Sequence, residues 1–221
     1  MSNLSVTIEG PAGYLEALLW VPPTNPPPLA AVICHPHPLY GGTMHNKVVY
    51  HTARTLHRHG LAVLRFNFRG VGGSQGAYDA GRGEVADASA ALDHLAAKFP
   101  GTPLLAAGFS FGAAVGLFAG CEDKRVVELI GLGLPVNDLD ARYLRLCAKP
   151  KLLIQGADDQ YGPKAKWDSL VAGFAPDIAA ATQVAFIPGA DHFFTGYIDK
   201  MDQVVAEWLT QLHPQLHPTE P

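Results

Sequence analysis

The sequence predicts an α/β fold with a mostly parallel sheet of about eight strands and helices on both of its faces. Short apolar runs such as residues 30–34 and 104–110 are hydrophobic throughout, as strands of a covered parallel sheet are. Segments with apolar residues at helical spacing separate these runs. At 221 residues the chain is long enough to bury one core, so we expect a single domain over residues 1–221.

The chain is expected to begin with a β-hairpin. Residues 4–9 and 14–21 alternate between polar and apolar side chains, and the Gly-Pro-Ala-Gly sequence at 10–13 interrupts the alternation. The proline-rich residues 22–28 cannot join the interior of a sheet, so we expect an extended surface loop there. Because two strands alone would not be stable, this loop is not expected to divide the chain into domains.

From residue 29 onward, strands are expected to alternate with helices. The expected strands are residues 30–34, 61–66, 104–110, 126–134, 151–155 and 182–187. The expected helices are residues 46–58, 84–99, 111–120, 139–147, 164–174 and 198–212. The segment 135–150 leaves room for only one short helix. The proline- and histidine-rich residues 213–221 are expected to form a tail.

The composition excludes several classes of partner. The formal net charge is −4 and the basic residues are scattered, unlike the basic patch of a nucleic-acid-binding protein. No apolar run reaches the length of about 18 residues needed to cross a membrane, and no signal-peptide pattern begins the chain. Cys34, Cys121 and Cys147 lie in apolar segments without metal-ligand or redox spacing. These features predict a cytoplasmic protein that acts on a small molecule, and they carry no signal for its oligomeric state.

A Gly-x-Ser-x-Gly motif lies where an expected strand meets an expected helix. It consists of Gly108, Ser110 and Gly112. In a nucleophile elbow the strand turns sharply into the helix. Only small residues therefore fit at the position two residues before the serine and at the position two residues after it. The strained turn lifts the serine hydroxyl above the edge of the sheet. The alternative is a glycine-rich turn whose serine only caps the helix.

A serine nucleophile needs a base within hydrogen-bond reach and an acid that orients this base. In a parallel sheet such groups follow the carboxyl ends of the strands. Asp158 and Asp159 follow one expected strand, and His192 follows the next. The chain order serine, aspartate, histidine is the order found in hydrolases with this motif. Asp138 and Asp140, after the preceding strand, are an alternative location for the acid, but they are expected to start a helix.

Five motifs make the chain similar to the α/β-hydrolases, in particular to the small, lidless bacterial serine hydrolases related to the dienelactone hydrolase-like group. The motifs lie at residues 35–44, 67–74, 108–112, 156–159 and 189–193. The resemblance covers residues 4–212 and implies the α/β-hydrolase fold with a Ser-His-Asp catalytic triad. Larger lipases and esterases of this kind carry a cap domain where residues 135–150 leave room for only one short helix, so we expect no cap domain and an open site. The usual spacing of the superfamily, a glycine followed two residues later by the acid, selects Asp159 over Asp158 as the partner of Ser110 and His192.

The oxyanion hole is expected to consist of two backbone N–H groups. One belongs to Phe111, directly after the nucleophile, and the other to the loop after the first parallel strand. Pro36 and Pro38 in that loop have no N–H to donate. The resemblance implies the amide of His37, with the amide of Leu39 as the alternative.

Two further motifs suggest cofactors, and neither is expected to bind one. His35-x-His37 has the spacing of two zinc ligands on a strand, but no third ligand of suitable spacing follows. The glycine-rich residues 69–74 lack the Gly-x-Gly-x-x-Gly spacing of a dinucleotide site. The histidines of the first expected helix and its flanks are expected to face solvent: His45, His51, His57 and His59.

Together these features predict a serine hydrolase that cleaves small soluble carboxylic esters through an acyl-enzyme. A thioesterase or acyltransferase with the same triad is the alternative enzyme, and a hydrolase-like binding protein is the alternative without activity. The expected partner is a small-molecule ester, with no nucleic acid and no membrane. The residues expected to line the substrate pocket are Tyr40, Gly41, Phe109, Tyr161 and Phe193.

Overall fold

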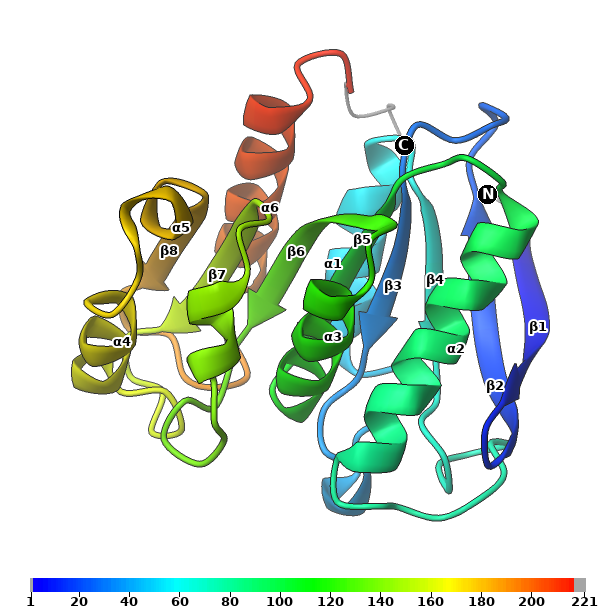
Figure 1. Ribbon diagram of the computed structural model, residues 1–221, viewed down its shortest axis with the longest axis horizontal. Helices are drawn as coiled ribbons and strands as arrows, with labels where there is room; N and C mark the ends of the chain where they lie inside the picture. Colours follow the sequence, from blue (N-terminus) through cyan, green and yellow to red (C-terminus); the bar gives the residue numbers. More distant parts are fainter. Residues whose placement is uncertain (1, 217–221) are drawn as a thin grey trace.

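An eight-stranded sheet in the order β1-β2-β4-β3-β5-β6-β7-β8 forms the centre of the protein (Figure 1). The computed structural model describes residues 2–216. The strands are β1 (Ser2–Gly10), β2 (Gly13–Val21), β3 (Ala30–Cys34), β4 (Ala62–Phe66), β5 (Leu104–Phe109), β6 (Val126–Leu132), β7 (Lys151–Gly156) and β8 (Thr182–Ile187). The hairpin β1-β2 is antiparallel and joins β4 in antiparallel register, while all pairs from β4 to β8 are parallel. The predicted fold class is confirmed.

The register of the parallel strands aligns their carboxyl ends. Cys34 at the end of β3 pairs with Gly108 of β5, and Leu132 at the end of β6 lies between Phe109 and Ile154 of the neighbouring strands. The loops that follow these strands therefore meet at one edge of the sheet, which is the lower edge in Figure 1. Open α/β sheets bind their ligands at this edge.

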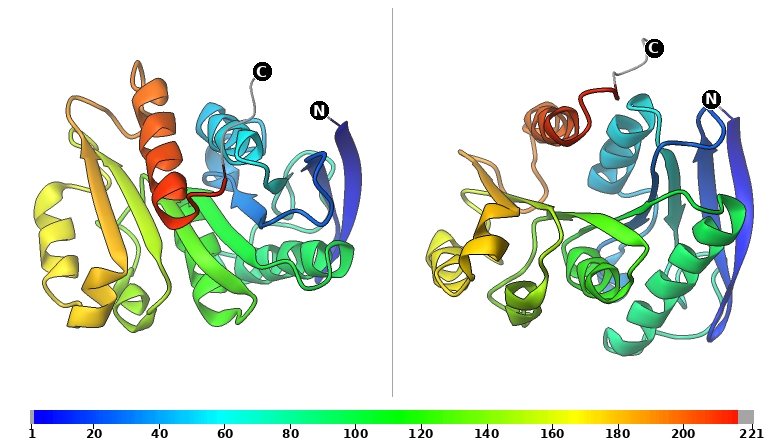
Figure 2. Two further views of the ribbon diagram at one scale, coloured as in Figure 1. Left: turned by 90° about the horizontal axis from the view of Figure 1, so that it is seen from above. Right: turned by 45° about the horizontal axis from the view of Figure 1, so that its top comes forward.

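Helices cover both faces of the sheet, as Figure 2 shows. They are α1 (Lys47–Arg58), α2 (Arg82–Lys98), α3 (Phe111–Glu122), α4 (Lys164–Val171), α5 (Pro176–Ala180) and α6 (Ile198–Leu212), with the short 3-10 helices η1 (Pro38–Tyr40) and η2 (Arg142–Leu146). The buried side chains of α2, α3, η2 and α4 form a core on one face, and those of α1 and α6 form a core on the other. No helix within residues 2–216 is long and apolar enough to span a membrane.

The connection between β6 and β7 contains η2 as its only helix, so no cap domain is inserted between these two strands. The helix expected over residues 139–147 is shorter and has 3-10 geometry. It begins where the carboxylate of Asp140 accepts a hydrogen bond from the backbone N–H of Arg142. The expected helix 164–174 ends at Val171, and α5 follows it with Pro176 at its first position, a residue favoured there.

Two of the histidines expected to face solvent are buried. The Nδ1 atom of His57 donates to the carbonyl of Leu61, and that of His59 donates to the carbonyl of Thr55. Hydrogen bonds to the nearby backbone satisfy these rings, which is why they can be buried at the end of α1. In the tail, His213 forms a hydrogen bond with buried Glu128 at 2.6 Å, while His217 lies outside the described residues.

Candidate active site

Ser110 occupies the sharp turn between β5 and α3. Its backbone has φ 56° and ψ −124°, a conformation that strains residues with a side chain. Its N–H donates to the carbonyl of Leu132 on the adjacent strand at 2.9 Å, which ties the turn to the sheet. A Cβ atom on Gly108 would lie 2.1 Å from the carbonyl oxygen of Gly112, so the turn closes only with glycine there. This geometry is that of a nucleophile elbow.

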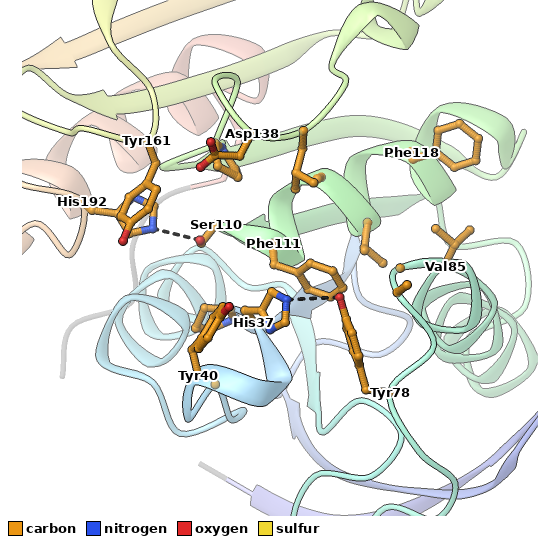
Figure 3. A pocket seen from close by; sticks show the side chains of 18 of the residues that line it. His37, Tyr40, Tyr78, Val85, Ser110, Phe111, Phe118, Asp138, Tyr161 and His192 are labelled. Atoms are coloured by element: carbon orange, nitrogen blue, oxygen red, sulfur yellow. Dashed lines mark hydrogen bonds between the residues drawn. The ribbon is translucent and has the colours of Figure 1, made fainter.

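Three loops bring Ser110, His192 and Asp159 into one hydrogen-bonded chain. The Nε2 atom of His192 lies 2.9 Å from the Ser110 hydroxyl (Figure 3), and its Nδ1 atom lies 2.7 Å from Oδ2 of Asp159. Because an ionised carboxylate only accepts, Nδ1 carries the hydrogen, which leaves Nε2 to accept from the serine hydroxyl. Asp159 is 2% exposed and His192 is 7% exposed, so the chain of groups lies largely out of water. This arrangement allows the imidazole to take the serine proton.

The carboxylate of Asp159 accepts two further hydrogen bonds. The side-chain amide of Gln155 donates to Oδ2 at 2.5 Å, and the backbone N–H of Tyr161 donates to Oδ1 at 2.8 Å. Gln155 lies on β7 and was not among the predicted site residues. The signal in the sequence is a polar residue inside a short apolar strand, and the structure shows that every residue of this strand is buried. A Cβ atom on Gly162 would lie 2.2 Å from the Gln155 amide nitrogen, so the loop also depends on a glycine.

The other acidic residues considered for the triad lie elsewhere. Asp158 is exposed, and its backbone N–H donates to the carbonyl of Ala190. Asp140 forms an exposed ion pair with Arg142. Asp138 lies at the cavity that contains Ser110, where it is exposed. Asp159 is therefore the carboxylate that contacts the imidazole of His192.

The loop after β8 holds His192 through its neighbours. The Asp191 carboxylate accepts from the N–H groups of Phe193 and Thr195, and these hydrogen bonds, chiefly that from Thr195, lower the pKa of Asp191. On the sheet side, Gly133 has φ +53°, and a Cβ atom there would lie 3.3 Å from Cε1 of His192. Gly133 thus lets the imidazole lie close to the end of β6.

The end of β3 and the start of α3 are in close contact beside Ser110. A Cβ atom on Gly112 would lie 2.3 Å from the carbonyl oxygen of His35. Within the described part of the chain, the backbone N–H groups of Phe111 and His37 donate to no protein acceptor. The N–H of Leu39, the alternative donor, is occupied because it donates to Nδ1 of His37 at 3.2 Å. The geometry therefore favours Phe111 and His37 as the amides available to an oxyanion.

The buried side chain of His35 forms hydrogen bonds that hold the loop after β3 in place. Its Nε2 atom accepts from the N–H of Phe68 at 3.0 Å, so its Nδ1 atom carries the hydrogen and donates to the carbonyl of Pro36 at 2.6 Å. Burial lowers the pKa of His35 to about 4, which keeps the ring neutral near pH 7. The bond at Nε2 joins the loop after β3 to the loop after β4, and the bond at Nδ1 stays within the loop after β3. Neither ring nitrogen is therefore free to bind a metal ion.

A cavity of about 1120 Å³ opens at Ser110 and His192. Four of the five residues expected to line the substrate pocket lie at this cavity: Tyr40, Gly41, Tyr161 and Phe193. The expectation for Phe109 is wrong. Its side chain is fully buried in the core on the α1 and α6 face, with its ring 5.1 Å from that of His192. The reason is that β5 is covered on both faces, so its last side chain points into the core beneath the site.

The cavity also extends along α3, which was not predicted. Ala114 and Phe118 line it from this helix, together with Val85 of α2, Tyr143 of η2 and Tyr78 of the loop before α2. Figure 3 shows Phe118, Val85 and Tyr78. The sequence contains a signal for Ala114 and Phe118. They lie four and eight residues after Ser110, and residues at this spacing share one side of a helix. Val85, Tyr143 and Tyr78 come from distant segments and have no such signal.

The sheet order and the serine at the turn after β5 define the class of α/β serine hydrolases. Comparisons with known proteins agree. A serine hydrolase without a lid from Xanthomonas campestris is 30% identical with a TM-score of 0.87, and the match covers all of this chain (100%) and 98% of that chain. A serine hydrolase homologue from Coxiella burnetii is 37% identical with a TM-score of 0.86, and the match covers 94% of this chain and 97% of that one.

A third structure, a candidate α/β hydrolase of unknown function from Agrobacterium tumefaciens, is 32% identical over 99% of this chain and 100% of that one, with a TM-score of 0.88. An uncharacterised protein of Rickettsia prowazekii is 35% identical over 217 residues, which are 96% of this chain and 91% of that protein. The family model described as serine aminopeptidase, S33, matches residues 27–136, which include Ser110. The chain therefore belongs to the α/β-hydrolase superfamily. None of these relatives is named a dienelactone hydrolase, so that narrower relationship stays a prediction.

Proposed function

We propose that the protein is a carboxylesterase that hydrolyses small soluble esters through an acyl-enzyme, with Ser110, His192 and Asp159 as its catalytic triad. The observation that carries this proposal is the hydrogen-bonded chain from the serine hydroxyl through the imidazole to a buried carboxylate. The absence of a cap domain supports a soluble substrate, since the cavity at Ser110 is reached without the opening of a lid.

The reaction begins when Ser110 Oγ attacks the ester carbonyl and Nε2 of His192 takes the hydroxyl proton. Asp159 stabilises the imidazolium, and Gln155 and the N–H of Tyr161 hold the carboxylate in place. The amides of Phe111 and His37 donate to the oxyanion of the tetrahedral intermediate. His192 then protonates the leaving alcohol, and in the second half of the reaction it deprotonates the water that releases the acid.

The test compares the two neighbouring aspartates as a matched pair. With p-nitrophenyl butyrate, Asp159→Asn should lower kcat by about 10⁴-fold because the imidazole loses its orienting anion. Asp158→Asn should leave kcat near that of the wild type, because this exposed side chain forms no contact with the imidazole. Equal losses in the two variants would contradict the assignment of the acid.

The nucleophile is tested by labelling as well as by turnover. A fluorophosphonate probe should label the wild type and fail to label Ser110→Ala, whose kcat/KM should fall by at least about 10³-fold. Unchanged ester hydrolysis in Ser110→Ala would overturn the proposal. A protein that binds esters but is neither labelled nor active would instead be the inactive, hydrolase-like binding protein.

Thioester and acyl-transfer reactions use the same groups, so products distinguish them. Acyl-thioester substrates and added alcohols measure how the acyl group is divided between water and other acceptors. We expect hydrolysis of the oxygen ester to dominate.

An aminopeptidase is the second candidate, because the matching family model carries that name and Asp138 lies at the cavity, where a carboxylate could bind a substrate ammonium group. Turnover of aminoacyl p-nitroanilides that is lost in Asp138→Asn would favour it over the esterase.

A further inference from the structure

Tyr78 presents its hydroxyl group to the cavity from the loop between β4 and α2. The hydroxyl oxygen lies 3.2 Å from Nε2 of His37. In Figure 3 the Tyr78 side chain reaches this hydrogen bond beside the rings of His37 and Phe111, on the side away from His192. The ring centroid of Tyr78 lies 5.0 Å from that of His37 and 6.0 Å from that of Phe111. Tyr78 is therefore held in place by two aromatic neighbours at the wall next to Ser110.

The hydrogen positions in this pair follow from the backbone. Because the N–H of Leu39 donates to Nδ1 of His37, that nitrogen carries no hydrogen. Burial lowers the pKa of His37, so the neutral ring has its hydrogen on Nε2 and donates it to the Tyr78 oxygen. The hydrogen of the Tyr78 hydroxyl then has no acceptor among the described residues. Burial also raises the pKa of Tyr78, which keeps this hydrogen in place.

Apolar side chains line the cavity beyond Tyr78: Val85 of α2, and Ala114 and Phe118 of α3. Phe118 lies eight residues after Ser110, which corresponds to about 12 Å along the helix. A second tyrosine of this cavity, Tyr143, has no hydrogen to offer because its hydroxyl donates to the carbonyl of Ala114 at 3.1 Å. The free donor of Tyr78 thus lies in surroundings that suit an extended, mostly hydrocarbon group.

The charge near Tyr78 favours a neutral acceptor. The buried carboxylate of Glu84 accepts hydrogen bonds from the backbone N–H groups of Asp79 and Gly81. Its negative charge adds to the effect of burial in raising the pKa of Tyr78, and at His37 it partly opposes the lowering of the pKa by burial. An anionic ligand group at the Tyr78 hydroxyl would be repelled by this carboxylate. An ether, ketone or hydroxyl oxygen would not.

We infer that the α3 side of the cavity binds the acyl group of the substrate, and that Tyr78 donates a hydrogen bond to a neutral oxygen part-way along this group. The substrate class is then an ester of a medium-length, uncharged acyl group that carries one oxygen acceptor. The inference rests on the proposed esterase activity for its catalytic consequence, but the binding preference can be measured without turnover.

The experiment moves one ether oxygen along an acyl chain. p-Nitrophenyl octanoate is compared with isomers in which one methylene, at successive positions from the middle to the end of the chain, is replaced by oxygen. Calorimetry with Ser110→Ala measures binding of each ester without cleavage, and kcat/KM of the enzyme with an intact Ser110 measures turnover. We expect one isomer to bind about three- to ten-fold more tightly than the other isomers.

Two tyrosine variants, each combined with Ser110→Ala for the binding measurement, connect this preference to Tyr78. Tyr78→Phe should remove it, with the octanoate ester of the same variant as the internal reference. Tyr143→Phe is the matched control, because its hydroxyl hydrogen is already bound to the backbone, and it should keep the preference. A preference that survives Tyr78→Phe, or the absence of a preferred isomer, would overturn the inference.

The two proposals fail separately. If the octanoate ester binds but Ser110 does not cleave it, the esterase proposal is wrong, and the binding preference still decides the role of Tyr78. If the ester is cleaved but all ether isomers behave alike, the esterase proposal stands and the role of Tyr78 is wrong.

Discussion

Gln155 donates its side-chain amide to the same oxygen of Asp159 that contacts His192, at a distance of 2.5 Å. The opposite end of this amide, Oε1, is buried and has no partner among the described residues. The position of the Gln155 side chain thus allows the hydrogen bond to Asp159 but leaves Oε1 without one. In the proposed mechanism, Gln155 therefore positions the acid of the triad, and it does not line the cavity at Ser110.

Gln155→Leu is expected to lower kcat about ten-fold and to leave KM unchanged, because the carboxylate loses one charge-assisted hydrogen bond. The free energy of unfolding should change little, because the substitution also removes the unpaired Oε1 atom. Steady-state kinetics and urea unfolding measure the two effects. Gln160→Leu on the exposed part of the same loop is the control and should leave kcat unchanged. A change in KM alone would contradict a positioning role.

Gly133→Ala should reduce both activity and stability. A Cβ atom at this residue would contact His192 and Phe109 at 3.0 to 3.4 Å, and the positive φ strains alanine by about 1 kcal/mol. The control is Gly101→Ala, which has φ +80° and open space around its Cβ position. It should lower the free energy of unfolding by a similar amount with kcat intact. If both variants retain full kcat, Gly133 has no role in placing the imidazole.

Acidification should destabilise the protein between about pH 6.5 and pH 4. The folded state holds the pKa of His35 at about 4, below its ordinary value of 6.5, so within this range the unfolded chain binds a proton that the folded protein excludes. His35 therefore lowers the free energy of unfolding by up to about 1.4 kcal/mol for each pH unit by which the solution is acidified. Over the whole range its contribution is on the order of 3 kcal/mol.

Urea unfolding at a series of pH values measures this dependence. His35→Gln keeps an acceptor-bearing side chain without a titrating ring, so its stability should depend less steeply on pH over the same range. An identical slope in the variant would show that other groups carry the effect.

Ester hydrolysis should rise smoothly with substrate concentration through the micelle threshold. The connection between β6 and β7 contains only η2, so there is no cap whose opening an interface could favour. Rates with p-nitrophenyl esters on either side of the threshold test this expectation. A sudden increase at the threshold would indicate that another segment covers the cavity in solution.

Much of the fold could be predicted because the pattern of buried residues is periodic. The strands from β3 to β7 are buried throughout, apart from Val127 on β6, and the exposed and buried residues of α1 and α6 follow the helical repeat. The short helix α5 was missed because five residues contain too little of a repeat. His57 and His59 were misplaced because a polar ring can be buried when the backbone satisfies it, and the sequence does not record such hydrogen bonds.

The convergence of Ser110, Asp159 and His192 follows from topology, since each residue comes after a parallel strand and these strands end at one edge. Gln155 and Tyr78 could not be predicted in this way. Their contribution depends on the direction of a side chain and on which atom carries a hydrogen. Phe109 was wrongly predicted to line the pocket because its position next to Ser110 does not determine the direction of its ring.

The strained backbone of Ser110 makes the nucleophile a weak point of the fold. Glycine adopts such angles without penalty, so Ser110→Gly should resist urea better than the wild type while it loses all turnover. At this residue, a substitution that increases the stability of the fold removes the activity. A search for hardier versions of the protein that selects on melting temperature alone would favour the loss of the enzyme, and so it must also select for catalysis.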